Sequence, residues 1–495
     1  MHRFLGGKWA RRSAVFAVVL AAGSYLAIRV WWSDGDQGQR LPQAPGCSQP
    51  ANIVVGPNVH VSTANPAHRH HETVVAADPL DAQRLFAFAM YHPTNPPSIV
   101  GYFSEDGGKR WQPSFDRRAG PGQPTLHDPS LAFAPDGTLY LAYLAIEEAT
   151  KQSGKKTIML FFRCADGRTK WEPLSTVEHN NPNLPSDPAL TRQPWADRPW
   201  LAIDGTAAEN RGRLYCASWL WLDVSADQGR SFASVPQPVS RDYTDYMPGN
   251  PVVLSDGTLV LARRLWSEKP HHVPGIGILL SGDGGQTLRE GPLVGTDRRD
   301  QRAEFKGGAG LQFTLQLAAD TSGSAFRDRV YVVWEDGQVE GNAAPGRPNR
   351  PGPSRILFAY SKDKGNSWIG PMILSEQPDN GDNAYGAYMP AVAVNKAGYV
   401  AVTWYDRRGL PMAPGSTPPF HAPGCNVRLR VSLDGGETWQ PSVQVNETAI
   451  KSSVWELRDT AGLAADSAGT FHAVWIDDRT GTTQVWTAAV RVEKR

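Results

Sequence analysis

The sequence predicts an all-β protein in which one small unit is repeated around a ring. The first observation is a short pattern, Ser-x-Asp-x-Gly-x-x followed by an aromatic residue or Leu, whose five copies begin at Ser104, Ser225, Ser281, Ser361 and Ser432. The second is another repeat that runs in phase with it. The third is the abundance of Trp, Tyr, Val and Thr in short runs, without helical periodicity in the body of the chain. Units that recur every several tens of residues indicate a repeat architecture.

Each copy of the first pattern follows an apolar run that is typical of a β-strand, such as Ile99 to Phe103, so we place it on a hairpin turn. Ser and Asp side chains can hydrogen-bond the amides of such a turn, Gly can adopt a positive φ, and the closing aromatic ring can pack beside the hairpin. An eroded sixth copy begins at Cys164. Because turn chemistry accounts for this spacing, we expect a structural role for the five Asp residues.

The second repeat marks the first strand of each unit, and its seven copies start at Glu72, Asp128, Arg198, Asn250, Gln312, Tyr388 and Asp459. Most copies are followed by a turn and a strongly β-prone run. These units predict a single β-propeller with seven four-stranded blades, with six blades as the alternative. The last unit lacks the first pattern, so we expect the segment from Asn52 to Val61 to supply its outer strand and close the ring without a free edge.

The first pattern is that of the aspartate box, also called the BNR repeat, and the chain resembles the sialidase (neuraminidase) superfamily of β-propellers. The resemblance implies that the boxes lie on blade hairpins away from the catalytic centre. Familiar sialidases have six blades, so a count of seven departs from that group. The Arg-Ile-Pro signature that opens bacterial sialidases is also missing, and the corresponding region runs from His68 to Glu72.

In a propeller the first strand of every blade lines the central channel, so the residues that head the second repeat are expected to converge at one mouth. The resemblance implies three arginines that hold the substrate carboxylate, a tyrosine nucleophile activated by a glutamate, and an aspartate that protonates the leaving group. An arginine fork matches a carboxylate, and a tyrosine attacks an anionic sugar without charge repulsion. By residue type, this assigns substrate binding to Arg198, Arg302, Arg458 and Glu72, and catalysis to Tyr388, Glu304 and Asp128. The alternative for each is a strand cap that satisfies backbone groups.

The segment with His68, His70, His71 and Glu72 carries side chains that suit a metal ion. Adjacent residues of an extended segment point to opposite sides, so only His70 and Glu72 would share a face. We therefore favour a polar loop leading into the first blade, and expect neither a metal nor a cofactor. Four cysteines can pair in three ways, and one of these joins Cys47 to Cys425 and Cys164 to Cys216. The alternative for Cys164 and Cys216 is that both remain free thiols buried in β-strands.

The first residues predict export, because Met1 to Arg12 are basic and are followed by an apolar run from Ser13 to Ile28. We expect an uncleaved anchor over residues 1–32, a tether over 33–51 and the propeller over 52–495, with a cleaved signal peptide as the alternative. The protein would then be anchored at the cell surface or in the periplasm, or secreted. The 50 basic and 49 acidic residues give a net charge of +1, which makes nucleic acid an unfavourable partner.

Two classes of function follow for the predicted propeller, which we expect to be a monomer. The first is an exo-acting glycoside hydrolase on sialic-acid-like or other glycans. The second is a non-catalytic scaffold that binds glycan or protein at the cell surface, and a lyase on the same fold is a third. Three arginines that converge with a Tyr–Glu pair at the channel mouth would favour the sialidase type of hydrolase.

Overall fold

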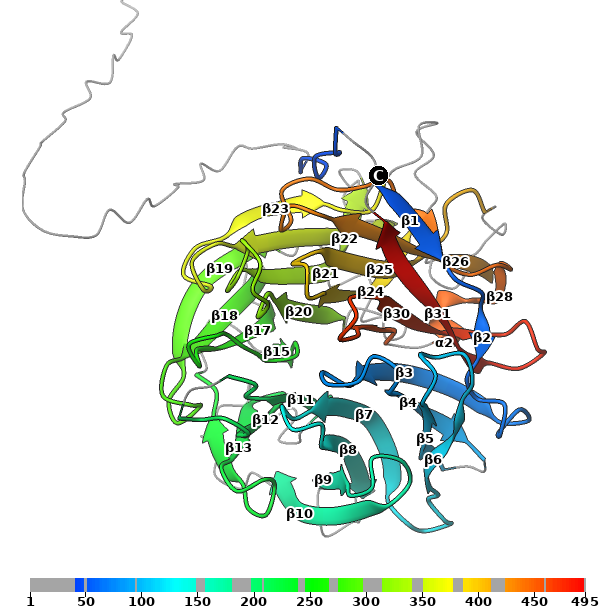
Figure 1. Cartoon of the computed structure of the whole chain (residues 1–495), viewed down its shortest axis with the longest axis vertical. Coiled ribbons are helices and arrows are strands. Elements are labelled where there is room, and N and C mark those ends of the chain that lie inside the picture. The colour runs from blue at the N-terminus through cyan, green and yellow to red at the C-terminus, as the bar shows by residue number, and fades with distance from the viewer. Residues whose placement is uncertain are drawn as a thin grey trace, which may run out of the picture. The chain divides into compact units, whose positions relative to one another are not determined.

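The computed structural model describes residues 41–48, 51–93, 96–147, 156–179, 197–206, 209–238, 245–266, 275–296, 314–340, 350–376, 386–410, 423–457 and 460–493. Within these ranges the chain forms a β-propeller of seven antiparallel blades (Figure 1). The seven-bladed, all-β prediction is therefore confirmed. In the described part of the chain, a single four-residue helix, α2 (Val454–Leu457), accompanies the strands.

Each blade has four main strands, and in blades 1 to 6 these strands follow one another along the chain from the channel to the rim. Blades 1 to 3 are β3 (Arg69–Ala77), β4 (Leu85–His92), β5 (Ser98–Ser104), β6 (Gln112–Arg117); β7 (Thr125–Phe133), β8 (Leu139–Glu147), β9 (Lys156–Cys164), β10 (Trp171–His179); and β11 (Trp200–Ile203), β12 (Leu214–Ser218), β13 (Trp221–Ser225), β14 (Ala233–Pro236). Blades 4 and 5 are β15 (Asp245–Pro248), β17 (Leu259–Trp266), β18 (Gly275–Ser281), β19 (Arg289–Thr296); and β20 (Leu315–Ala319), β21 (Val330–Glu340), β22 (Arg350–Ser361), β23 (Ile369–Ile373). Blades 6 and 7 are β24 (Ala387–Val394), β25 (Val400–Asp406), β26 (Pro423–Ser432), β27 (Val443–Gln444); and β29 (Gly462–Ala465), β30 (Phe471–Asp477), β31 (Gln484–Glu493), β1 (Asn52–Val55). Three short strands, β2 (Val59–His60), β16 (Val252–Val253) and β28 (Ile450–Ser453), add to blades 7, 4 and 6.

The ring is closed by the N-terminal part of the propeller. The strand β1 pairs with β31 in antiparallel register from Asn52 opposite Glu493 to Val55 opposite Val490. Around the channel, the inner strands contact one another in a closed series from β3 through β7, β11, β16, β20, β24 and β29 back to β3. The expected closure by the segment from Asn52 to Val61 is confirmed, and β1 supplies the outer strand of blade 7.

A segment just before β1 is also fixed to the ring. The amide of Ala44 donates to the carbonyl of Ile373 (2.8 Å) on the outer strand of blade 5, and the Trp439 amide of blade 6 donates to Pro45 (2.8 Å). The Cys47 amide returns a bond to Trp439 (3.1 Å). We call residues 41–48 the strap. The strap's backbone groups thus find partners on two blades, and the strap belongs to the compact unit Leu41–Arg495.

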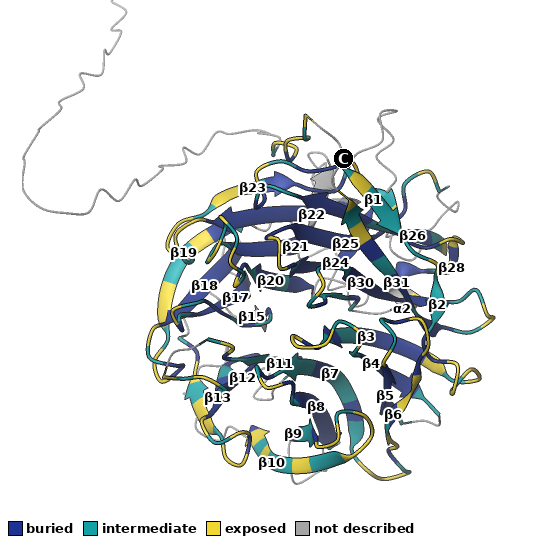
Figure 2. Cartoon of the chain, viewed as in Figure 1, coloured by how far each residue is buried: buried dark blue, intermediate teal, exposed yellow. Residues whose placement is uncertain are grey.

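The apolar core lies between neighbouring blades, where the middle strands are buried on both faces and the outer strands are partly exposed (Figure 2). The inner strands of adjacent blades do not form a common sheet, and side chains bond across some of these gaps instead. Asn250 accepts from the amide of Leu317 and donates to its carbonyl, both at 2.8 Å. Ser130 likewise accepts from the Leu201 amide (2.9 Å). Such bonds satisfy backbone groups that would otherwise be buried without partners.

The aspartate boxes form the turns between the third and fourth strands of blades 1 to 6, as the sequence predicts. In the box of blade 6, the Ser432 hydroxyl donates to Asp434 and accepts from the Gly436 amide, each at 2.8 Å. Gly436 has a φ of 93°, and a Cβ there would lie 2.9 Å from the Phe358 ring of blade 5. Trp439 is fully buried, with its ring centroid 4.9 Å from that of Phe358. The boxes thus join each hairpin to the blade before it.

The four cysteines and the N-terminal segment were also the subject of sequence predictions. Cys47, Cys164, Cys216 and Cys425 are all free, so of the alternatives that the sequence left open the structure has unpaired thiols. Cys164 instead replaces the serine of the eroded box, with its Sγ 3.6 Å from Asp166. Residues 1–40, which carry the export prediction, lie outside the described residues. Among the residues that are described, no helix is long and apolar enough to cross a membrane.

Candidate functional site

The inner strands of blades 1, 2 and 3 share an unusual backbone conformation near their first residues. Glu72, Asp128 and Arg198 have φ values of 52°, 53° and 51°, in the left-handed region. In blades 1 and 2 the pairing register shifts at this point, between His71 and Val74 and between His127 and Ser130. Residues other than glycine seldom adopt this conformation, which costs about 1–3 kcal/mol each and is concentrated at functional sites.

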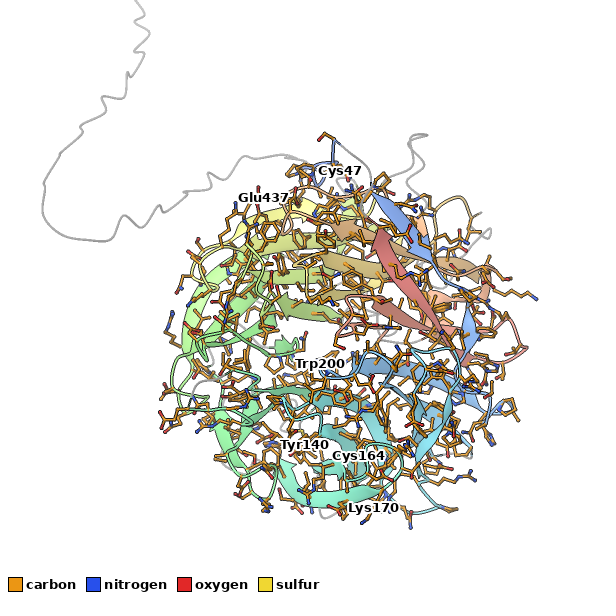
Figure 3. All side chains as sticks on the ribbon, viewed as in Figure 1. Cys47, Tyr140, Cys164, Lys170, Trp200 and Glu437 are labelled. Atoms are coloured by element: carbon orange, nitrogen blue, oxygen red, sulfur yellow. The ribbon has the colours of Figure 1, made fainter. Side chains whose placement is uncertain are left out.

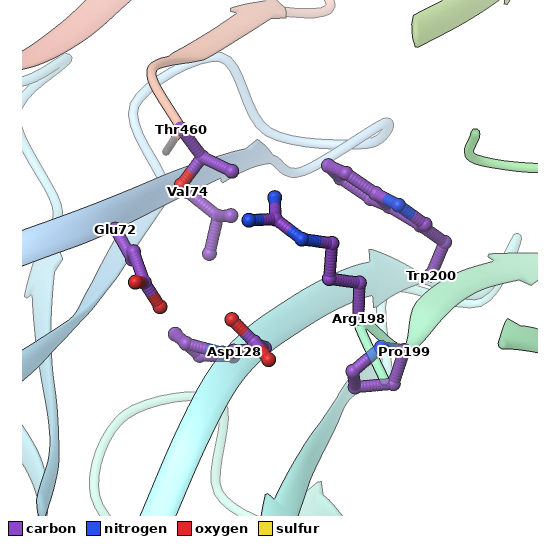
Figure 4. Close-up of a pocket in the computed structure, with 8 residues that line it drawn as sticks. Glu72, Val74, Asp128, Arg198, Pro199, Trp200 and Thr460 are labelled. Carbon is purple, nitrogen blue, oxygen red and sulfur yellow. The ribbon is translucent and has the colours of Figure 1, made fainter. Parts of the chain in front are cut away.

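These three residues meet in one pocket (Figure 4). It is lined by Glu72, Val74, Asp128, Pro129, Arg198, Pro199, Trp200 and Thr460. Glu72 and Arg198 are each only 8% exposed. Figure 4 shows the Arg198 side chain between the indole of Trp200 and the two carboxylates. The pocket therefore combines two carboxylates, one guanidinium and one aromatic ring from three successive blades.

Of the seven predicted site residues, the structure brings Glu72, Asp128 and Arg198 together. Arg302, Glu304 and Arg458 lie outside the described residues, as do Gln312 and Asp459, which head two copies of the second repeat. Their predicted roles stay predictions.

Tyr388 is described but does not line the pocket. It is 2% exposed and packs in the apolar cluster shared by blades 6, 7 and 1. In blade 6 the left-handed position belongs to Met389, with a φ of 52°, and the register shift falls between Tyr388 and Ala391. The head of this repeat copy is therefore one residue later than the sequence suggests, and its side chain is apolar.

Five of the eight lining residues were not predicted: Val74, Pro129, Pro199, Trp200 and Thr460. Two of them, Trp200 and Thr460, carry polar groups. Trp200 lies two residues after Arg198, and Thr460 precedes the inner strand of blade 7, where its hydroxyl donates to the Thr73 carbonyl (3.4 Å). Residues two apart on an extended segment share a face, and this rule would have identified Trp200 as a neighbour of the repeat head. No comparable signal in the sequence identifies Thr460.

The histidines before Glu72 are structural. The strand β3 begins at Arg69, so His70 and His71 belong to a strand and not to the loop that we expected. His70 is fully buried, with Nδ1 2.8 Å from the His68 carbonyl and Nε2 2.8 Å from the Tyr102 hydroxyl. Burial lowers the pKa of His70 to about 4, which leaves the ring neutral. The described residues contain no group of three or more His, Cys, Asp or Glu side chains that could hold a metal ion.

Comparisons with known proteins give matches to solved structures at low sequence identity. No family model matches the chain, and no curated protein matches it. A protein of unknown function from Dyadobacter fermentans is 12% identical, with a TM-score of 0.47 over 89% of this chain and 99% of that one. An α-L-arabinofuranosidase from Fusarium graminearum is 13% identical, with a TM-score of 0.43 over 88% of this chain and 98% of that one. A Trypanosoma rangeli sialidase is 11% identical, with a TM-score of 0.43 over 86% of this chain and 54% of that one. This chain is a seven-bladed β-propeller. Its activity does not follow from these comparisons.

Proposed function

We propose that the pocket binds the terminal sugar of a glycan and that the chain hydrolyses its glycosidic bond. The observation that supports this is the convergence of Glu72, Asp128, Arg198 and Trp200 from three neighbouring blades. Most glycoside hydrolases use a pair of carboxyl groups on either side of the scissile bond. Ligand pockets also combine apolar walls with a few converging polar groups, as here.

In this proposal Asp128 is the general acid and Glu72 the second carboxylate. Asp128 protonates the glycosidic oxygen as its bond to the anomeric carbon breaks. Glu72 then either attacks that carbon directly or takes a proton from the water that does so, and water supplies the new hydroxyl. We thus assign Glu72 a catalytic role in place of substrate binding, because it shares the pocket with Asp128. Arg198 binds sugar hydroxyls and holds the carboxylates in place.

The charge of the pocket favours a neutral sugar. Its described lining residues carry two carboxylates against one guanidinium. A sugar with its own carboxylate would meet net negative charge there, unless arginines from outside the described residues also approach. The two candidates are Arg302 and Arg458, and the sialidase type of reaction depends on them. The apolar ring face of a neutral sugar, in contrast, can pack against Trp200, Pro129 and Pro199 without any further charged group.

The test compares the purified full-length chain with two isosteric variants, Glu72→Gln and Asp128→Asn. The substrates are 4-nitrophenyl glycosides of D-galactose, L-arabinofuranose and N-acetylneuraminic acid. We expect turnover of a neutral glycoside and a loss of about a hundredfold or more in each variant, since positioned acid–base groups contribute 10²–10⁴-fold. Glu178→Gln, an exposed carboxylate of β10, is the matched control and should leave turnover unchanged.

Turnover of no glycoside would overturn hydrolysis. If the free sugars nevertheless bound, the non-catalytic glycan-binding scaffold would replace it. Turnover of the sialoside alone would favour the sialidase type and assign the missing positive charge to Arg302 and Arg458.

A further inference from the structure

Trp200 is held in a way that suits a binding surface. It begins β11, directly after Arg198 and Pro199, and one side of its indole packs on the apolar cluster between blades 3 and 4 that includes Tyr215 and Leu222. The same ring lines the pocket (Figure 4). Figure 3 shows Trp200 near the centre of the ring of blades, whereas Cys47 lies at the rim. An aromatic ring that is fixed from behind loses little freedom when a ligand covers its other side.

The indole also has an unmade hydrogen bond. Its Nε1 is shielded from solvent, and no acceptor lies within hydrogen-bonding distance of it among the described residues. Because water does not reach Nε1, a hydroxyl of a bound molecule does not reach it either. The indole therefore offers the pocket its ring and not its N–H.

We propose that Trp200 is the platform on which the sugar ring stacks. This inference rests on the proposed function for the class of ligand. It specifies a neutral sugar whose C–H groups lie together on one face of the ring, as in terminal galactose, because such a face packs against an aromatic ring while the hydroxyls point elsewhere. The two carboxylates and Arg198 then contact the hydroxyl edge.

The experiment titrates D-galactose and L-arabinose into the full-length chain and follows the sugar protons by NMR. A ring that stacks on the indole shows upfield shifts of the C–H protons of one face. We expect Trp200→Ala to abolish these shifts and to weaken binding at least tenfold. Trp200→Phe keeps a smaller aromatic face, so it should retain the shifts and bind about threefold to tenfold more weakly.

Trp486→Phe is the matched control, because the Trp486 Nε1 is also buried without an acceptor in the described residues, but on β31 and not in the pocket wall. It should bind as the parent does. Thermal melting checks that each variant is folded, and the phenylalanine variant decides the question if Trp200→Ala does not fold.

Binding by Trp200→Ala within twofold of the parent would overturn the platform, even if Glu72→Gln and Asp128→Asn lose turnover as proposed. Loss of the upfield shifts in a folded Trp200→Phe would overturn it as well, because that variant keeps an aromatic face. If the parent binds neither sugar, the neutral-sugar specificity falls, whereas hydrolysis of a sialoside would still support the proposed activity.

Discussion

Trp439 tests whether the aspartate boxes are structural. Its indole is fully buried between blades 5 and 6, and its backbone is bonded to the strap. Truncation of a buried Trp to Ala costs about 3–5 kcal/mol. Unfolding entropy of about 2.1 cal/mol/K per residue gives roughly 1 kcal/mol/K for a unit of about 450 residues, so Trp439→Ala should lower the melting temperature by about 3–5 °C.

The matched control is Trp368→Ala, at the same box position in blade 5. Trp368 is only partly buried, with its Nε1 donating to the Gly365 carbonyl (3.2 Å), so its removal should cost less. Calorimetry and urea unfolding measure both variants, and turnover per folded molecule should stay at the parent level. The reasoning fails if Trp439→Ala is as stable as the parent, or if it loses ligand binding without losing stability.

Three further predictions concern pH, the strap and export. The Ser231 hydroxyl and nearby amides lower the pKa of Asp227 to about 2, although burial acts in the opposite direction. The stability that ionised Asp227 contributes should therefore be fully present above about pH 4 and lost as the pH falls towards 2. Urea unfolding at stepped pH should show a shallower loss for Asp227→Asn, and an identical pH profile would contradict this. Deletion of the chain up to Pro50 removes the strap's bonds to Ile373 and Trp439 and should lower the melting temperature relative to a chain that starts at Leu41; equal melting temperatures would show that the strap contributes nothing. Fractionation should find the full chain with a membrane, a mature N-terminus near residue 33 would indicate a cleaved signal peptide, and cytoplasmic protein with an intact N-terminus would refute export.

Local and periodic signals predicted the fold well. The boxes are hairpin turns whose Ser, Asp and Gly bond within a few residues, so each copy specifies its own structure. The seven copies of the second repeat gave the number of blades, and the missing outer strand of the last copy predicted its closure by Asn52 to Val61. These features depend on short sequence distances or on counting repeats.

The site was less predictable because it depends on local irregularity and on distant contacts. The sequence predicted Tyr388 as the head of its repeat copy, but Met389 has the left-handed backbone that marks this position in blades 1, 2 and 3. A shift of one residue in strand pairing leaves no trace in the hydrophobic pattern. Asn250 heads its repeat copy like Asp128, yet it bonds to the backbone at Leu317 in the next blade. The strap joins Ala44 to Ile373, and no local pattern indicates a contact over such a distance.

The central claim is that Asp128 acts as the general acid of a glycoside hydrolase, and leaving-group dependence tests it most directly. The measurement is kcat/KM of the parent and Asp128→Asn on glycosides of one sugar with poor and good leaving groups, such as methyl and 2,4-dinitrophenyl. A good leaving group departs without a proton, so the account predicts a large loss for the first and a small one for the second. Equal losses on both substrates, or no loss on either, would contradict it.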